Sequence, residues 1–228
     1  YTATYVTSVD LERDASVLAG PQVFISNFHD EYWSRAMRDN LVAAQNSGLN
    51  AAFLDANNMY WQVRFESSSG GQSNRVMVSY KDAGLDPMGA TNVATVRWRD
   101  GPVSEPENAV LGVMYESDFT YGSSFPWVVQ NSAHWIYSGT NLNDGDQLLG
   151  LVGYEYDAVW ANGATPAGLT VLASSPVIDG LGVSGTHNAA IFPNPMSGAI
   201  TFTAGTNYWS WRLDDNAYKA YGEDPQVQ

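Results

Sequence analysis

A strand, a helix and a second strand follow one another, with short joints, in the first quarter of the chain. The continuous apolar run PQVFIS, residues 21–26, is typical of a strand that is covered on both faces. The segment RAMRDNLVAAQNSG has apolar residues at helical spacing, Ser34 before it as an N-cap and Gly48 at its end as a left-handed C-cap. LNAAFLDA, residues 49–56, reads as the next buried strand. This order predicts a right-handed crossover and a parallel sheet.

The pattern changes from about residue 62 onward. Short apolar segments alternate with Gly, Pro, Asn and Asp, which is typical of antiparallel strands and turns. Two late segments, LTVLASSPV (169–177) and AITFTAG (199–205), again resemble buried strands. We therefore expect an α/β fold in which a parallel sheet carries a β-rich antiparallel insertion or extension.

The charge balance limits the partners that the chain can bind. Its 24 acidic and 10 basic residues give a formal net charge of −14. Nucleic acids bind through Lys and Arg side chains that neutralise phosphates, so we expect no nucleic-acid partner. Anionic membranes are disfavoured for the same reason, and no apolar run is long enough to predict membrane insertion.

Cysteine is absent from the chain. This excludes thiol nucleophiles, disulfide bonds and thiolate metal sites. The aromatic fraction of 13% is high enough for a sugar-binding or other aromatic-lined surface. No nucleophile elbow, zinc-protease motif, P-loop or dinucleotide-binding motif is present.

Three segments that combine polar and aromatic residues directly follow predicted buried strands. They are FHDEYW (28–33), DANNMYW (55–61) and GTNYWSW (205–211). Loops at the carboxyl ends of parallel strands converge at one edge of the sheet, where ligands bind. We therefore expect these three segments to meet.

Tyr32 lies just before the helix that is predicted to begin near Ser34. A helix N-terminus stabilises a negative charge by roughly 0.3–1 kcal/mol, which is too little to ionise a phenol with a pKa of about 10 at neutral pH. A bound cation would supply the rest, so a metal-bound tyrosinate is one interpretation. The alternative is that His29 and its acidic neighbours cap the helix while Tyr32 packs.

Other candidate residues lie later in the chain. GLVGYEYD (150–157) places Glu155 and Asp157 on one face of an extended segment, where a carboxylate could bind a metal, act as a base or form a surface salt bridge. His134, in NSAHWIYSG, reads as a partly buried histidine with satisfied hydrogen bonds. His187, in the turn-rich SGTHNAA, is expected to be exposed.

Seven segments, taken in order, resemble one known family. They are HDEYWSRAMRDNL, AFLDANNMYWQVRFE, RVMVSYKD, PENAVLGVMY, GLVGYEYD, LTVLASSPV and AITFTAGTNYWSW. Together they resemble the C-terminal domain of the N,N-dimethylformamidase large-subunit-like family, in its branch of uncharacterised secreted or surface bacterial proteins.

The resemblance implies a flavodoxin-like, class I glutamine amidotransferase-like fold for one domain over residues 1–228. It also implies that the first strand and helix, and an upstream β-sandwich domain, are absent from this chain. The expected location is extracellular or at the cell surface. Homo-oligomerisation is a further expectation.

The family chemistry is hydrolysis of a small formamide at a mononuclear ferric ion, Fe(III), held by two tyrosines and a glutamate. Phenolate and carboxylate oxygens suit such a hard ion. In this chain the motif H-x-E-Y-W assigns one ligand to Tyr32, with His29 and Glu31 as its other members. The second tyrosine matches Tyr1 or Tyr5.

The family glutamate has no counterpart in the matching segment GATNVATVRWRD. Glu155 or Glu116 would have to take its place as the third metal ligand.

Three hypotheses for function follow. The first is a metal-dependent amide hydrolase with Tyr32, Tyr5 and Glu155 as ligands. In it His29 and Glu31 transfer protons, and Asn57 and Asn207 donate to the oxyanion. The second is a non-catalytic extracellular domain that binds a glycan or other ligand. The third is a structural or assembly module.

Overall fold

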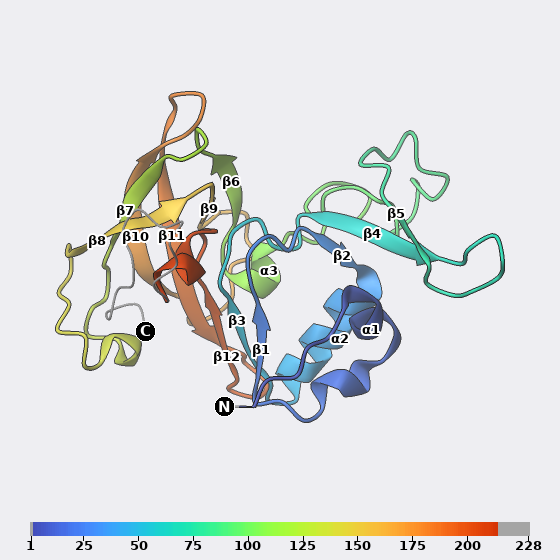
Figure 1. Cartoon of the computed structure of the whole chain (residues 1–228), viewed down its shortest axis with the longest axis horizontal. Coiled ribbons are helices and arrows are strands. Elements are labelled where there is room, and N and C mark those ends of the chain that lie inside the picture. Colours follow the sequence, from blue (N-terminus) through green and yellow to red (C-terminus); the bar gives the residue numbers. More distant parts are fainter. Residues whose placement is uncertain (1, 214–228) are drawn as a thin grey trace.

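The computed structural model describes residues 2–213 of the chain (Figure 1). Its strands are β1 (Val23–Ser26), β2 (Tyr32–Ser34), β3 (Asn50–Phe53), β4 (Trp61–Glu66), β5 (Val76–Val78), β6 (Met114–Asp118), β7 (Ser124–Val128), β8 (Gln147–Gly153), β9 (Glu155–Ala158), β10 (Thr170–Ile178), β11 (Ser184–Pro193) and β12 (Ile200–Thr203). Its α-helices are α1 (Ser8–Arg13), α2 (Arg35–Asn46) and α3 (Asn108–Leu111), and its 3₁₀ turns are η1 (Ala15–Leu18), η2 (Trp135–Tyr137) and η3 (Trp209–Arg212).

The central sheet has five strands in the order β1-β3-β12-β11-β10. β1 and β3 pair in parallel, as do β3 and β12, whereas β11 pairs antiparallel with both β12 and β10. The late strands β10 and β12 lie where the apolar segments predicted them. The carboxyl ends of three parallel strands therefore meet at one edge of the sheet.

Helix α2 lies between β1 and β3, as the sequence predicts, and the short strand β2, which was not predicted, directly precedes it. The Ser34 hydroxyl caps it by accepting from the Met37 backbone N–H at 3.1 Å, and Gly48 beyond its end has φ +109°. Its apolar face, with Met37 and Leu41, packs in a core that also contains Trp33 and Phe53. This packing covers one face of β1 and β3.

The expected flavodoxin-like, class I glutamine amidotransferase-like α/β fold is wrong. The structure is mostly strands in mixed and antiparallel sheets, and α2 is its longest described helix with 12 residues. A doubly wound sheet needs a helix between successive parallel strands. After β3 the connections are loops rich in Gly, Pro, Asn and Asp, in which the one described α-helix is α3 with four residues. Such loops favour antiparallel neighbours instead.

A second core lies among the strands that follow residue 113. β6 pairs with β9 and β7 with β8, both antiparallel. Trp127, Leu151, Tyr156 and Leu172 are buried between these strands and the β10–β11 hairpin. Figure 1 shows these strands on one side of β1 and β3, with α1 and α2 on the other. No helix in the described part of the chain is long and apolar enough to span a membrane.

Strand β9 is joined to the segment that follows β12. The Asp157 backbone N–H donates to the Gly205 carbonyl at 2.9 Å, and Tyr156 forms an isolated antiparallel bridge with Thr206. β9 therefore lies against the carboxyl edge of the central sheet, where the loops after β1, β3 and β12 also lie.

Candidate metal centre

Three side chains from two distant parts of the chain converge on one point. His29 and Glu31 lie between β1 and β2, and Glu155 is the first residue of β9. Their potential ligand atoms all lie within 4.8 Å of one another. His29 Nε2 is 3.4 Å from Glu31 Oε1, and His29 Nδ1 is 3.2 Å from Glu155 Oε2. An imidazole nitrogen and two carboxylates form a donor set that can hold a transition-metal ion.

Asn57, which follows β3, bridges the two carboxylates. Its side-chain Nδ2 donates to Glu31 Oε1 at 2.6 Å and to Glu155 Oε1 at 3.4 Å. Its backbone has φ +60°, a left-handed conformation in which Asn is enriched. Its backbone N–H donates to Asp157 Oδ1 at 2.9 Å. A side chain of β9 thus holds the backbone of the loop after β3.

Asn207, which follows β12, contacts the Nδ1 atom of His29 and so affects which ring nitrogen carries the proton. With the side-chain amide assigned from its contacts, Nδ2 donates to the Phe28 carbonyl at 3.2 Å and lies 3.1 Å from His29 Nδ1. An amide NH₂ group only donates, so in the neutral ring this contact favours a lone pair on Nδ1 and the ring proton on Nε2. In that neutral form the lone pair faces Glu155 Oε2, a buried oxygen 3.2 Å from Nδ1. Two facing electron pairs repel each other unless a cation lies between them.

A proton is the cation that would take this place without a metal ion. The carboxylates of Glu155 and then Glu31 raise the pKa of His29 from 6.5 to about 10, against the opposing effect of partial burial. Burial acts to raise the pKa of Glu31, but its contacts, led by His29, lower that pKa overall. Metal binding must therefore displace a proton from His29.

Several buried oxygen atoms around this point have no hydrogen-bond partner in the described structure. They are Asn57 Oδ1, Glu155 Oε2, Asp157 Oδ2 and Asn207 Oδ1. An unsatisfied buried polar atom costs about 1–3 kcal/mol. A metal ion with bound water would give such atoms partners. The residues present therefore fit a hydrated metal ion.

Aromatic rings flank the three side chains. The Tyr154 ring lies 5.6 Å from the His29 ring, and the Phe28 ring lies 6.4 Å from it. Tyr115 packs edge-to-face on Tyr60 at 5.1 Å. Burial, and then the charge of Glu155, raises the pKa of the Tyr115 phenol, so it stays protonated. The surroundings of the centre are therefore aromatic and able to donate hydrogen bonds.

The comparison with protein families gives a match over nearly the whole chain. The family described as N,N-dimethylformamidase beta subunit-like, C-terminal, matches residues 1–222. The chain belongs to this family. The resemblance that the sequence motifs indicate is thereby confirmed. No curated protein matches the chain.

In this N,N-dimethylformamidase-like domain, Tyr32 lies next to the centre and contacts a lysine. Lys81 Nζ donates to the Tyr32 hydroxyl at 2.9 Å. The same ammonium group lies 5.0 Å from the centre of the Tyr32 ring and 4.7 Å from that of Trp61. The Tyr32 hydroxyl also helps to lower the pKa of Glu31, after the larger effects of burial and His29. A ligand role for Tyr32 stays a prediction.

The other predicted ligands lie in different surroundings. Tyr5 precedes α1 with 93% of its side chain exposed, and no described hydrogen bond or ion pair links it to His29, Glu31 or Glu155. Tyr1 lies outside the described residues. Glu116 is exposed on β6. Of the two glutamates proposed to replace the family ligand, Glu155 is the one in the cluster.

Lys81 was not predicted to take part in the centre, and Asp157 was predicted only as a carboxylate on the same face as Glu155. For Asp157 a signal existed, because it is two residues from Glu155 and therefore lies on the same side of an extended strand. For Lys81 there was none, since it follows β5 and reaches Tyr32 through the tertiary fold.

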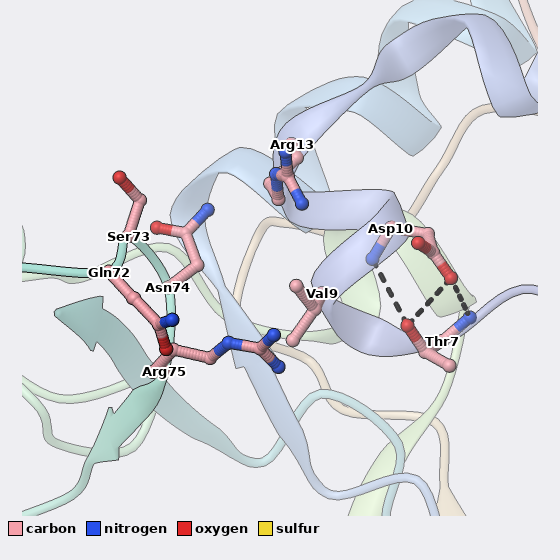
Figure 2. A pocket seen from close by; sticks show the side chains of 8 residues that line it. All are labelled: Thr7, Val9, Asp10, Arg13, Gln72, Ser73, Asn74 and Arg75. Atoms are coloured by element: carbon pink, nitrogen blue, oxygen red, sulfur yellow. Dashed lines mark hydrogen bonds between the residues drawn. The ribbon is translucent and has the colours of Figure 1, made fainter. Parts of the chain in front are cut away.

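The cavity in Figure 2 lies elsewhere in this N,N-dimethylformamidase-like domain. It has a volume of about 700 Å³ and is bounded by α1 and the loop before β5. Arg13 and Arg75 approach it from two sides (Figure 2), and the Asp10 carboxylate accepts from the Thr7 backbone at 2.9 Å and hydroxyl at 2.7 Å. It shares no residue with the centre, so it is not part of the candidate site.

Proposed function

We propose that the domain is a metal-dependent hydrolase of small, formamide-type amides, with His29, Glu31 and Glu155 holding the ion. The observation that carries this proposal is the convergence of His29, Glu31 and Glu155, whose potential ligand atoms all lie within 4.8 Å of one another. Family membership supports the substrate class. Iron, as Fe(III), is the ion that we propose first.

A bound ion would polarise the amide carbonyl and lower the pKa of a bound water. Glu31 stays ionised at neutral pH because its pKa lies below the ordinary value. One of its oxygens could therefore hold the ion while the other accepts a proton from that water. Its contact with His29 Nε2 fixes the imidazole tautomer.

Asn57 and Asn207 are the residues that we propose to orient the substrate. Both are buried, and each has an unpaired side-chain oxygen at the centre. Their NH₂ groups already have partners, since that of Asn57 donates to Glu31 and Glu155, and that of Asn207 donates to the Phe28 carbonyl and contacts His29. Each unpaired side-chain oxygen would accept a hydrogen bond from the N–H of a formamide substrate or from a bound water. An NH₂ group would donate to the carbonyl oxygen, as negative charge develops on it, only after giving up one of its present contacts.

Metal content and hydrolysis of formamide and N,N-dimethylformamide test this function together. The purified chain is loaded separately with iron, zinc and manganese, and bound metal is counted by mass spectrometry. We expect about one ion per chain, and we expect Glu155→Gln to weaken binding by tenfold or more, since it removes a charged ligand. Glu116→Gln, an exposed glutamate on β6, is the matched control. A wild-type chain that holds none of the three metals would contradict the proposal.

Exposed aromatic side chains favour a second function, namely glycan binding by a secreted or surface domain. Tyr121 is 90% exposed and Trp135 is 63% exposed. Exposed aromatic rings stack on sugar faces. A glycan array tests this function, and Trp135→Ala should abolish any signal that depends on this surface.

A further inference from the structure

Asp157 is a fully buried carboxylate without an ion pair. Its exposed fraction is 0%, and no Lys, Arg or His side chain in the described chain lies within ion-pair distance of it. Oδ1 accepts one hydrogen bond, from the Asn57 backbone N–H at 2.9 Å, and Oδ2 has no partner. A buried charge of this kind costs stability. Burial alone therefore does not explain why a carboxylate occupies this position.

Its single hydrogen bond lies at the residue that bridges the metal ligands. Asn57 has φ +60°, so its loop turns sharply just where its side chain must reach Glu31 and Glu155. The Asp157 carboxylate holds the backbone of that turn. Glu155 and Asp157 belong to the same strand, β9, so one strand supplies a ligand and fixes the residue that bridges the ligands.

We propose that Asp157 is a positioning residue of the metal centre, acting through the backbone N–H of Asn57 to hold the Asn57 side chain across Glu31 and Glu155. This inference rests on the proposed metal-binding function. β9 is itself fixed to the loop after β12, because the Asp157 backbone N–H donates to the Gly205 carbonyl. The backbone that carries the carboxylate is therefore held in place. Removing it frees the Asn57 turn without altering any of the three ligands.

Metal affinity of two Asp157 variants tests the inference. Asp157→Ala removes the acceptor, and we expect the metal dissociation constant to rise about tenfold or more, as for other residues that orient metal ligands. Asp157→Asn keeps an acceptor oxygen in the same place and should stay within about threefold of wild type. Asp55→Ala is the matched control for Asp157→Ala. Asp55 is equally buried beside the same loop, but its carboxylate accepts from Asn58 instead of Asn57.

A double-mutant cycle separates positioning from a general structural role. In an Asn57→Ala background, Asp157→Ala should change the metal dissociation constant by less than twofold, because its route to the ligands is already gone. A full tenfold effect in that background would overturn the inference. An Asp157→Ala protein that binds metal as tightly as wild type would also overturn it.

Hydrogen exchange at the Asn57 amide keeps the inference testable if Asp157→Ala does not fold. The amide should be strongly protected in wild type and in Asp157→Asn, and rapid exchange in the folded wild type would overturn the inference. The experiments distinguish a failure of the proposed metal-binding function from a failure of the role of Asp157. A wild type that binds no metal contradicts the proposed function, whereas a metal-binding wild type with an unprotected Asn57 amide contradicts only the role of Asp157.

Discussion

The imidazole Nδ1 of His29 lies 3.2 Å from Glu155 Oε2, so a protonated ring donates to this buried oxygen, whereas a neutral ring can face it with a lone pair. A proton and a metal ion therefore compete for the same space. Because the neighbouring carboxylates raise the pKa of His29 to about 10, the metal-free imidazole is protonated at neutral pH.

Metal affinity should accordingly increase with pH. Below about pH 10, each bound ion displaces one proton from His29, so the dissociation constant should fall about tenfold per pH unit between roughly pH 7 and 9. Titration calorimetry in buffers of different ionisation enthalpy measures both the constant and the proton release. His29→Gln should lose the proton release, and wild-type binding that is independent of pH would contradict this competition.

Tyr32 gives a spectroscopic prediction. If its phenolate is a ligand, the iron-loaded protein should show a visible charge-transfer band that Tyr32→Phe lacks. The band should strengthen in Lys81→Met, because Lys81 Nζ then no longer donates to the phenol oxygen. Tyr121→Phe, at a side chain that is 90% exposed, serves as the control. A band that persists in Tyr32→Phe would show that the ligand is another residue.

Local sequence patterns predicted the part of the fold that depends on local interactions. Helix α2 between β1 and β3 was predicted from its apolar periodicity, its Ser34 cap and Gly48 at its end. The parallel pairing of β1 with β3 was predicted from this strand, helix, strand order. The overall fold class did not follow, because the direction in which short strands pair depends on distant partners. β12 pairs with β3, although β3 comes about 150 residues earlier in the chain. The apolar pattern of neither strand specifies this pairing.

The same limit applies to the centre and to His187. The ends of parallel strands predicted that the loops carrying His29, Asn57 and Asn207 would meet. The pairing of β9 with β6, which helps to bring Glu155 to the same point, is a tertiary property. His187 was expected to be exposed, which is wrong. It lies in β11 between β10 and β12 and is fully buried, since two neighbouring strands override the local turn signals of Gly185 and Asn188.

Asp157→Asn should stabilise the metal-free protein at alkaline pH. Burial raises the pKa of Asp157 from 3.8 to about 7, so the folded state pays for ionising this carboxylate above that pH. The cost is relieved as pH falls through about 7, where the folded state takes up a proton before the unfolded state does. Urea unfolding at several pH values should show Asp157→Asn more stable than wild type at pH 8, with the difference shrinking towards pH 5. A wild type that is equally stable at pH 8 would contradict this.

His187 should act in the opposite direction and lower stability in acid. Burial lowers its pKa from 6.5 to about 4, and Nε2 lies 2.9 Å from the Ala204 carbonyl. Between these two pKa values the unfolded state binds the proton and the folded state does not, so stability is lost as pH falls from 6.5 towards 4. Between pH 7.5 and 5 wild type should lose about 2 kcal/mol more than His187→Gln, a comparison in which the contribution of Asp157 cancels. His134→Gln, at a histidine that is partly exposed on the surface, should behave like wild type. Equal acid sensitivity in His187→Gln and wild type would mean that His187 takes up its proton without unfolding.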